Sequence, residues 1–435
     1  MTVLEIRQRV LDEVDAHRNE IVTLLAGLVR VPSVSRRTAG DELACQRYVE
    51  QVMDRMGLAL DVFVPDEIAG ITGHPGWSPG HDYTDRPNVV GTRRGTGGGR
   101  SLLLLSHVDV VAEGPHELWR HGPFNPTIED GSLVGRGSND DKGGLTAQIM
   151  ALSCVESAGL RVAGEVILAS VVDEESGSGN GTLAVLQRPH LADGAVYCDG
   201  LDLDVHTASL GGINTRIDLQ LNLTHVEGKI DGVMPVVMAI YEELQRFARE
   251  RTAYFRADPV YSGTVWPDHA VRIALLQAGS EDGGNPGGAR VDVGAYVLPG
   301  EEPAAVFEQL EQRVRTVAAP FGDLLLPPRI APVARAMSPS SIPDDDHFAD
   351  AVAAAYSEAT GKEARRTGMP MSDLFQFLLH SPRPMPSVAM GPGRWAVPGA
   401  AHEANEAVLI DEHLIPFVKT LALLIVDWCG VTPAN

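Results

Sequence analysis

The sequence lacks the cysteine patterns that mark a disulfide framework or a thiolate zinc site. Its four cysteines, Cys45, Cys154, Cys198 and Cys429, are scattered along the chain, and none belongs to a CxxC pair. Proteins that depend on disulfides usually carry regularly spaced cysteines and belong to oxidising compartments. The sequence therefore predicts a protein of the reducing cytoplasm.

Long apolar runs and positive charges are also scarce. No stretch approaches the roughly eighteen apolar residues that a membrane-spanning helix needs, and residues 1–29 carry charges throughout, unlike a secretion signal. Lysine and arginine number 35 against 58 aspartates and glutamates, which gives a formal net charge of −23. Because such a protein repels a phosphate backbone, we expect neither a membrane nor a nucleic acid as its partner.

The remaining composition is typical of a large soluble globular protein. Hydrophobic residues make up 44% and charged residues 21% of the 435 residues. A chain of this length is too long for one ordinary core. It predicts two domains, or one large α/β domain with an insertion.

The first half of the chain alternates between strand and helix patterns. Residues 102–105, 165–172 and 195–198 are apolar runs that read as buried strands, and residues 143–158 have helical spacing. This alternation predicts a mostly parallel central sheet with helices on both of its faces. The fold class that we predict is therefore α/β.

The pattern changes at about residue 210. Residues 215–223 and 290–297 alternate with a period of two, and residues 233–249 and 303–317 have helical spacing. These segments predict a small antiparallel sheet with two helices. We therefore expect an α+β domain at residues 209–328, inserted into a main domain that consists of residues 1–208 and 329–435.

Polar side chains follow the predicted parallel strands. His107 follows the first strand, Glu174 and Glu175 follow the second, and Asp199 follows the third. Each is a weak signal alone, since a single histidine at a strand end is more often structural. Ligands nevertheless collect at the carboxyl ends of strands in such sheets, so we expect these side chains to share one site.

Two loops and one neighbouring residue complete the candidate site. Asp140 lies in the glycine-rich turn GRGSNDDKGG, and His402 lies in the loop GPGRWAVPGAAHEANE. Asp109, two residues after His107, points to the same side of the strand. It is placed to hold the second imidazole nitrogen, as the carboxylate behind a metal-bound histidine does.

This set of imidazoles and carboxylates predicts a metal centre. Zinc suits mixed nitrogen and oxygen ligands, and manganese or cobalt would also be accepted. Five ligands exceed the four of one tetrahedral ion and suit two ions about 3.5–4 Å apart that share a carboxylate. Such ions activate water and polarise a carbonyl oxygen, and Glu174 is the candidate that carries the proton. The predicted reaction is the hydrolysis of an amide.

Five motifs occur in order along the chain: SHVDVV, Trp119 with GPF, GRGSNDDKGG, VVDEE and the C-terminal GPG and AHEANE. Together they resemble the M20 metallopeptidase and deacylase family over nearly the whole of the main domain. The resemblance implies a zinc-peptidase-like catalytic domain, interrupted by a smaller lid domain that commonly forms the dimer.

The resemblance also implies a set of metal ligands. His107, Asp140 and Asp199 would hold one zinc ion, and Asp140, Glu175 and His402 would hold the other. Asp140 would therefore bridge two Zn²⁺ ions in each chain.

Two further roles are implied by the same motifs. Asp109 would orient His107, and Glu174 would act as the general acid and base. The peptide bond between Asp140 and Asp141 is expected to be cis, an uncommon state for a residue other than proline.

Substrate-binding residues are less clearly marked. Deacylase members usually have Glu and Pro where this chain has Asp199 and Gly200, and aspartate is more typical of dipeptidase and aminopeptidase members. His225 resembles the lid histidine that reaches the partner's active site. Tyr296 stands where an arginine is often found, so Arg366 is a candidate for binding a substrate carboxylate; a surface arginine is the alternative.

These observations leave three interpretations. The first is a dinuclear zinc amidohydrolase that cleaves a small N-acyl amino acid or a related amide, and that forms a cytoplasmic homodimer through its lid. The second is a dipeptidase or aminopeptidase, which Asp199 favours. The third is a catalytically silent relative that only binds a ligand, although every matched ligand and base position is filled.

Overall fold

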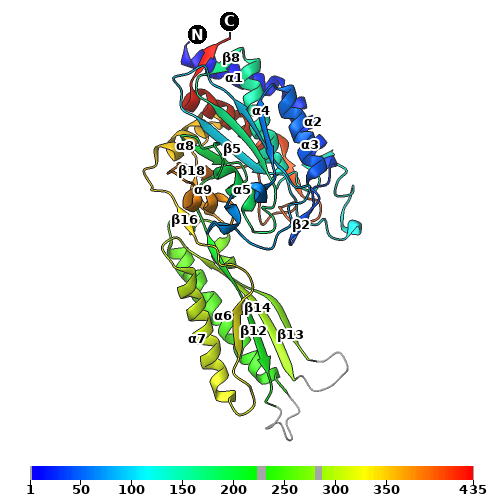
Figure 1. Ribbon diagram of the computed structural model, residues 1–435, viewed down its shortest axis with the longest axis vertical. Coiled ribbons are helices and arrows are strands. Elements are labelled where there is room, and N and C mark those ends of the chain that lie inside the picture. The colour runs from blue at the N-terminus through cyan, green and yellow to red at the C-terminus, as the bar shows by residue number, and fades with distance from the viewer. Residues whose placement is uncertain (1, 223–231, 280–286, 435) are drawn as a thin grey trace. The chain divides into compact units, whose positions relative to one another are not determined.

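The computed structural model describes residues 2–222, 232–279 and 287–434 (Figure 1). The chain divides into two compact units. The first unit comprises Met1–Thr207 and Ile342–Asn435, and the second comprises Ala208–Ser341. None of the helices in the described residues combines the length and the apolar character that crossing a membrane requires.

The first unit is built on a mixed sheet whose centre is parallel. Its strands follow the order β11-β18-β10-β5-β9-β4-β3, with β17 beside β11. The four strands β18, β10, β5 and β9 are mutually parallel, whereas β4, β3 and β11 pair antiparallel at the two sides. The α/β fold class is therefore confirmed; the central sheet is mixed, and its four middle strands are parallel. The strands are β3 (Ala59–Phe63), β4 (Asn88–Arg93), β5 (Leu102–His107), β9 (Val166–Val171), β10 (Ala195–Tyr197), β11 (Val205–Ser209), β17 (Arg366–Met369) and β18 (Ser387–Ala389).

Burial explains why the central strands read as unbroken apolar runs. All six residues of β5 and all six of β9 are buried, because helices cover both faces of a parallel sheet. β9 and β10 lie on opposite sides of β5. Since crossover connections are right-handed, α4 (Lys142–Ser157) and α5 (Asn180–Leu186) cover opposite faces.

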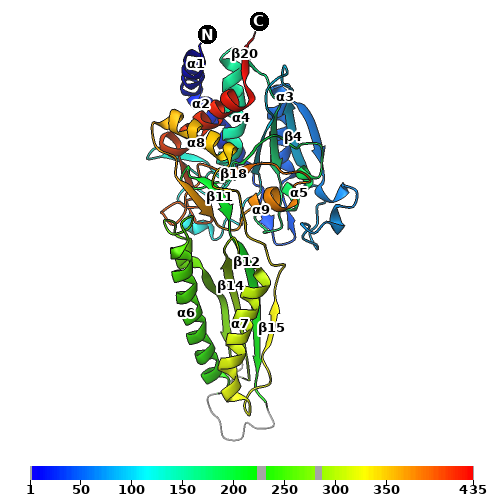
Figure 2. The same ribbon diagram turned by 90° about the vertical axis from the view of Figure 1, so that its left-hand side faces the viewer.

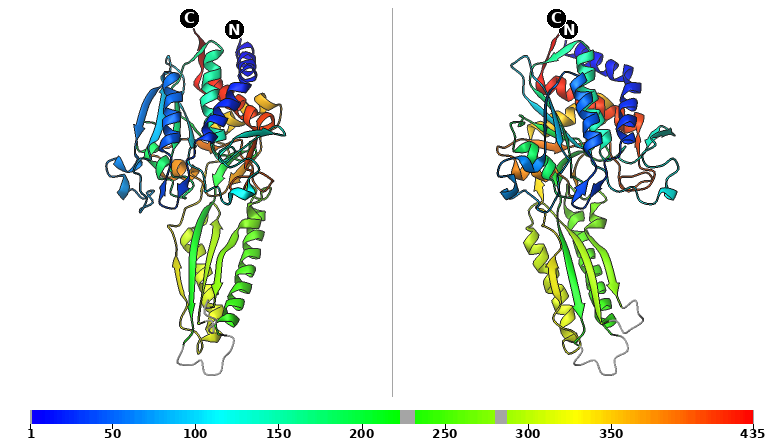
Figure 3. Two further views of the ribbon diagram at one scale, coloured as in Figure 1. Left: turned by 90° about the vertical axis from the view of Figure 1, so that its right-hand side faces the viewer. Right: turned by 45° about the vertical axis from the view of Figure 1, so that its right-hand side comes forward.

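The helices at the two ends of the chain pack on the same part of the first unit. α1 (Val3–Ala16), α2 (Arg18–Arg30) and α4 lie side by side (Figure 3), and α10 (Ile415–Leu424) packs on α1 and α4. Apolar residues at helical spacing over residues 2–29 predict one helix. The structure has two helices there, because the backbone leaves the helical conformation at His17. The other helices of this unit are α3 (Leu43–Arg55), α8 (His347–Thr360) and α9 (Leu374–His380).

The second unit is a four-stranded antiparallel sheet with two long helices, α6 (Met234–Ala257) and α7 (Pro303–Ala318), that pack against each other (Figure 2). Its strands follow the order β13-β14-β12-β15. Whereas the sequence suggested a return to the main domain at residue 329, the second unit continues to Ser341, because β15 pairs with β12. The strands are β12 (Gly211–Gln220), β13 (Val271–Ala278), β14 (Gly288–Val297) and β15 (Arg329–Pro332).

Candidate metal centre

The adjacent strands β5 and β10 fix the location of the site. The chain leaves β5 toward β9 on one side, and it leaves β10 toward β11 on the other side. Ligand sites in open α/β sheets form where neighbouring connections diverge in this way. His107 is the last residue of β5, and Asp199 follows β10 by two residues, so both side chains lie at this point.

The carboxylate of Asp140 lies between two imidazoles. Its Oδ1 is 2.9 Å from Nε2 of His107, and its Oδ2 is 3.2 Å from Nε2 of His402. Nε2 of His402 is also 2.9 Å from Oε2 of Glu175, and Nε2 of His107 is 3.8 Å from Oδ2 of Asp199. The structure thus brings together all five residues that the sequence suggested as metal ligands.

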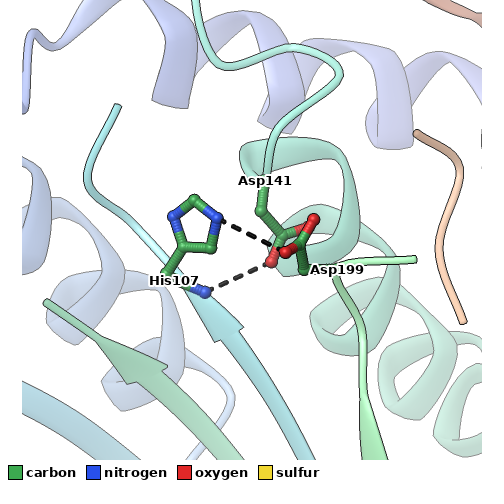
Figure 4. Close-up of side chains that lie close together, drawn as sticks. All are labelled: His107, Asp141 and Asp199. Carbon is green, nitrogen blue, oxygen red and sulfur yellow. Dashed lines mark hydrogen bonds and ion pairs between the residues drawn. The ribbon is translucent and has the colours of Figure 1, made fainter. Parts of the chain in front are cut away.

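Asp141, the second carboxylate of the glycine-rich turn, belongs to the same cluster, although the sequence did not mark it as a ligand. His107, Asp141 and Asp199 converge in Figure 4, and the backbone N–H of His107 donates to Oδ2 of Asp141 over 3.2 Å. Oδ1 of Asp141 is buried and accepts no hydrogen bond among the described residues. A Cβ atom on Gly144 would lie 2.2 Å from this Oδ1, which explains a glycine in the DDKGG turn. The expected cis peptide bond between Asp140 and Asp141 is confirmed.

Asp109 connects the imidazole of His107 to the loop after β9. Its backbone carbonyl lies 2.9 Å from Nδ1 of His107, closer than its carboxylate at 3.6 Å. The carboxylate instead accepts the backbone N–H groups of Glu174, over 3.3 Å, and of Glu175, over 3.0 Å. The carbonyl of Asp109 therefore fixes the tautomer of His107, and its carboxylate fixes the turn that carries both glutamates.

The electrostatics of the cluster fit bound cations. Burial raises the pKa of Asp199 to about 7, and the charge of Asp140 acts in the same direction. Burial likewise raises the pKa of Glu174 well above its usual range. Burial alone would lower the pKa of His402, but its hydrogen bonds to Asp140 and Glu175 raise that pKa to about 11. Divalent ions would relieve this crowding of buried negative charge, and imidazole nitrogens with carboxylate oxygens are ligands that zinc accepts. The residues present therefore fit a metal centre.

Glu406 is a supporting residue whose partners the sequence did not reveal. Its Oε1 accepts the backbone N–H groups of Asn139, over 2.9 Å, and of Asp140, over 3.0 Å. Its Oε2 accepts from Arg136 over 2.6 Å, and both side chains are almost fully buried. Glu406 follows His402 by four residues, so it ties the His402 loop to the Asp140 loop. The only sequence signal for it is a second acid in AHEANE.

Of the two predicted substrate-binding residues, one is paired with neighbouring groups and the other lies outside the described residues. Arg366 is exposed; it forms an ion pair with Asp350 and donates to the backbone carbonyl of Asp344 over 2.9 Å. His225 falls in the range 223–231, outside the described residues. A role for either residue in substrate binding stays a prediction.

Comparison with known proteins identifies similar chains over nearly the full length. The model of peptidase family M20/M25/M40 matches residues 103–427. Among curated proteins, N-formyl-4-amino-5-aminomethyl-2-methylpyrimidine deformylase of Bacillus subtilis is 26% identical over 447 residues, which cover 96% of this chain and 96% of the relative.

Solved structures support the fold. Human carnosine dipeptidase 1 aligns with a TM-score of 0.71 at 16% identity, covering 98% of this chain and 99% of that chain. A dinuclear metal binding peptidase of the M20 family from Bacillus subtilis aligns with a TM-score of 0.60 at 16% identity, covering 95% of this chain and 99% of that chain. At these identities the likeness concerns the fold alone.

Neutralising Glu406 should destabilise the first unit strongly. Glu406→Gln leaves Arg136, only 2% exposed, without its anionic partner, and breaking such a buried pair costs about 3–5 kcal/mol in the free energy of unfolding. The matched control is Asp41→Asn, which removes the partner of Arg36 where both side chains are about 60% exposed; it should cost less than about 1 kcal/mol. Chemical denaturation measures both variants, and equal losses would contradict the assignment of Glu406.

Proposed function

Because the chain belongs to peptidase family M20/M25/M40, it is a hydrolase of amide or peptide bonds, and we propose that it cleaves a small amide with two metal ions. One observation carries this proposal: the two oxygens of Asp140 each face a different imidazole, from His107 and from His402. A carboxylate in that position can hold one ion with each oxygen.

We assign His107, Asp140 and Asp199 to one ion and Asp140, Glu175 and His402 to the other. When bound, the two ions polarise the carbonyl oxygen of the amide and lower the pKa of a water molecule. Zinc is the ion that we propose, because its borderline-soft character suits this mixture of nitrogen and oxygen donors; manganese and cobalt are the alternatives.

Glu174 is the residue to which we assign the proton transfer. It lies beside the ligand Glu175, and its backbone N–H is held by Asp109. Its buried carboxyl has a raised pKa, which suits a group that must take a proton from water and then give it to the departing amine. Asp109 serves this step by holding the turn in place.

For the substrate we propose a formamide of a small heteroaromatic amine. The support is the curated deformylase relative, which matches 96% of this chain. Trp395, half-buried in the loop before His402, adds a physical reason. The ring centroids of Trp395 and His402 are 5.6 Å apart, and the two ring planes meet at 76°. An aromatic substrate near His402 can therefore stack against an indole. A dipeptide is the second candidate, favoured by Asp199 and by a carboxylate-binding role for Arg366.

We further propose that two copies of the chain pair through the second unit. β13 is an edge strand of its sheet, and an exposed edge offers unpaired backbone groups to a second strand. β13 and the adjacent α6 line a groove of about 430 Å³. Several apolar side chains of these two elements are 37–52% exposed, among them Met238, Tyr241, Leu275 and Leu276. Symmetric pairing of this face would cover them.

All four cysteines are buried and free, which supports a reducing cytoplasm as the compartment.

The first prediction of this proposal concerns Glu174. Glu174→Gln should retain two metal ions per chain, because no proposed ligand changes, yet lose about 10²- to 10⁴-fold in kcat, the usual contribution of general acid and base catalysis. Metal analysis and amide-hydrolysis assays of the same preparation test this. Glu117→Gln, at an exposed position, is the control and should keep full activity. Full turnover by Glu174→Gln would assign the proton transfer to another residue.

The second prediction concerns the substrate. The metal-loaded protein should hydrolyse the formamide of a heteroaromatic methylamine faster than the formamide of a linear alkylamine, an N-acetyl amino acid or a dipeptide. Trp395→Ala should lower kcat/KM for the aromatic formamide about threefold to tenfold, the worth of one aromatic pair, and hardly affect the alkyl formamide. Trp395→Phe should restore most of the loss. Hydrolysis of dipeptides alone would reject the formamide proposal.

The third prediction concerns the dimer. Sedimentation velocity should give twice the chain mass of 46.5 kDa for the natural protein. Leu276→Lys should shift it to a monomer, because a lysine on an edge strand opposes pairing. Leu326→Lys changes a leucine of similar exposure, 42% against 43%, outside β13 and α6. That variant should stay dimeric; a dimeric Leu276→Lys variant would place the interface elsewhere.

A further inference from the structure

The loop before β4 reaches the turn that carries Glu174. In this loop the hydroxyl of Tyr83 donates to Oδ2 of Asp173 over 2.5 Å, and Nδ1 of His81 lies 3.1 Å from the same oxygen. Tyr83 and Asp173 are both buried. The range 68–86 is rich in Gly and Pro, which predicts an ordered surface loop. The end of this loop instead contacts the residue that precedes the proposed base.

Arg86 links this turn to a second, distant element. Its guanidinium donates to both oxygens of Glu42, over 2.7 and 2.8 Å, and to Oδ1 of Asp173 over 3.0 Å. Glu42 lies at the start of α3, and the side chains of all three residues are at most 1% exposed. The planar guanidinium fork suits this double contact, which a lysine cannot reproduce.

The loop is itself fixed to the start of α5. The side-chain amide of Asn180 donates to the hydroxyl of Tyr83 over 2.7 Å and to the carbonyl of Ser78 over 2.8 Å. Its Oδ1 accepts the backbone N–H of Ser78 over 2.8 Å. The hydroxyl of Tyr83 is therefore held by Asn180 as well as by its contact with Asp173.

Asp173 has an unusual backbone. Its φ is +71°, in the left-handed region that costs free energy for most residues. Its side chain also accepts from Ser178 over 2.5 Å, and its carbonyl accepts from the same hydroxyl over 2.9 Å. On the other side of the turn, Asp109 accepts the N–H groups of Glu174 and Glu175. The backbone is thus held on both sides of Glu174.

We propose that Tyr83 and Arg86 are positioning residues for Glu174, acting through Asp173. This inference rests on the proposed function, in which Glu174 transfers the proton. A buried ion pair alone is weak support for a role in stability. Here four polar side chains, those of His81, Tyr83, Arg86 and Ser178, contact the carboxylate next to the base. Strained backbone with such support clusters at active sites. Displacing a catalytic group by about 1 Å can cost about 10²-fold in rate, so fixing this turn matters.

A double-mutant cycle tests the link to Glu174. Tyr83→Phe removes one hydroxyl and keeps the ring; it should lower kcat about tenfold, with KM and the metal content unchanged. In a Glu174→Gln background the same change should lower kcat less than about twofold, because interacting residues are not additive. Tyr356→Phe, which removes a hydroxyl from α8, should leave kcat unchanged in both backgrounds. Equal losses in both backgrounds, or a loss that follows the metal content, would overturn the proposal.

Hydrogen exchange supplies a readout that needs no activity. The peptide containing Glu174 and Glu175 should exchange faster in Tyr83→Phe than in the natural protein, and at the natural rate in Tyr356→Phe. Arg86→Lys should show the same acceleration, since it keeps the charge and loses the fork. Unchanged exchange in Tyr83→Phe would refute the positioning role. If the natural protein hydrolyses no amide, the proposed function fails, whereas the exchange result still decides whether the loop holds the turn.

Discussion

The carboxylate of Asp140, with one oxygen toward His107 and the other toward His402, is the interaction on which the site depends. The two histidines are far apart in the sequence, and only a folded first unit brings their Nε2 atoms to the same carboxylate. The carboxylates of Glu175 and Asp199 lie within 4 Å of these two imidazoles, Glu175 beside His402 and Asp199 beside His107. So many buried carboxylates stay ionised only beside strong positive charge, so the fold that forms this site also creates its need for cations.

Three buried carboxylates hold the backbone segments that carry the proposed ligands and the proposed base. Asp109 holds the backbone of Glu174 and Glu175, Glu406 holds the backbone of Asp140, and the side chain of Asp173 ties the same glutamate turn to a distant loop. In the first two cases the acceptor is a carboxylate and the donor is a backbone N–H. Such charge-assisted bonds are stronger than neutral ones and leave the ligand side chains free to face the site.

The sequence was sufficient for the features that depend on local patterns. His107 and Asp199 could be located because each follows an apolar run, and β5 and β10 are indeed adjacent parallel strands. Two antiparallel strands of the second unit, β12 and β14, followed from their alternation with a period of two, whereas β13 and β15 were not predicted. Asp140 and His402 lie in loops without any periodic pattern; they could be suggested only together with the other imidazoles and carboxylates, and the resemblance to a family then gave each a role as a ligand.

The sequence was not sufficient where pairing is long-range. Glu406 and Arg136 are 270 positions apart, and Arg86 and Asp173 are 87 apart; neither pair has a spacing that marks it. The break at His17 was missed because the apolar periodicity continues across it, although the backbone does not. Asp141 was passed over because its neighbour Asp140 already satisfied the pattern of ligands.

The origin of each ligand also suggests where specificity can change. His107 ends β5 and Asp199 lies two residues beyond β10, and the register of these two strands is fixed by their pairing, so the separation of the two ligands changes little unless the sheet does. His402 lies in a loop, at a positive φ of 66°, and depends on contacts such as those of Glu406. Trp395 belongs to the same loop and packs against the His402 ring. A substitution there can alter which amide is bound, because loops tolerate change better than the sheet that supports them, while the ligands on the strands keep the hydrolytic chemistry intact.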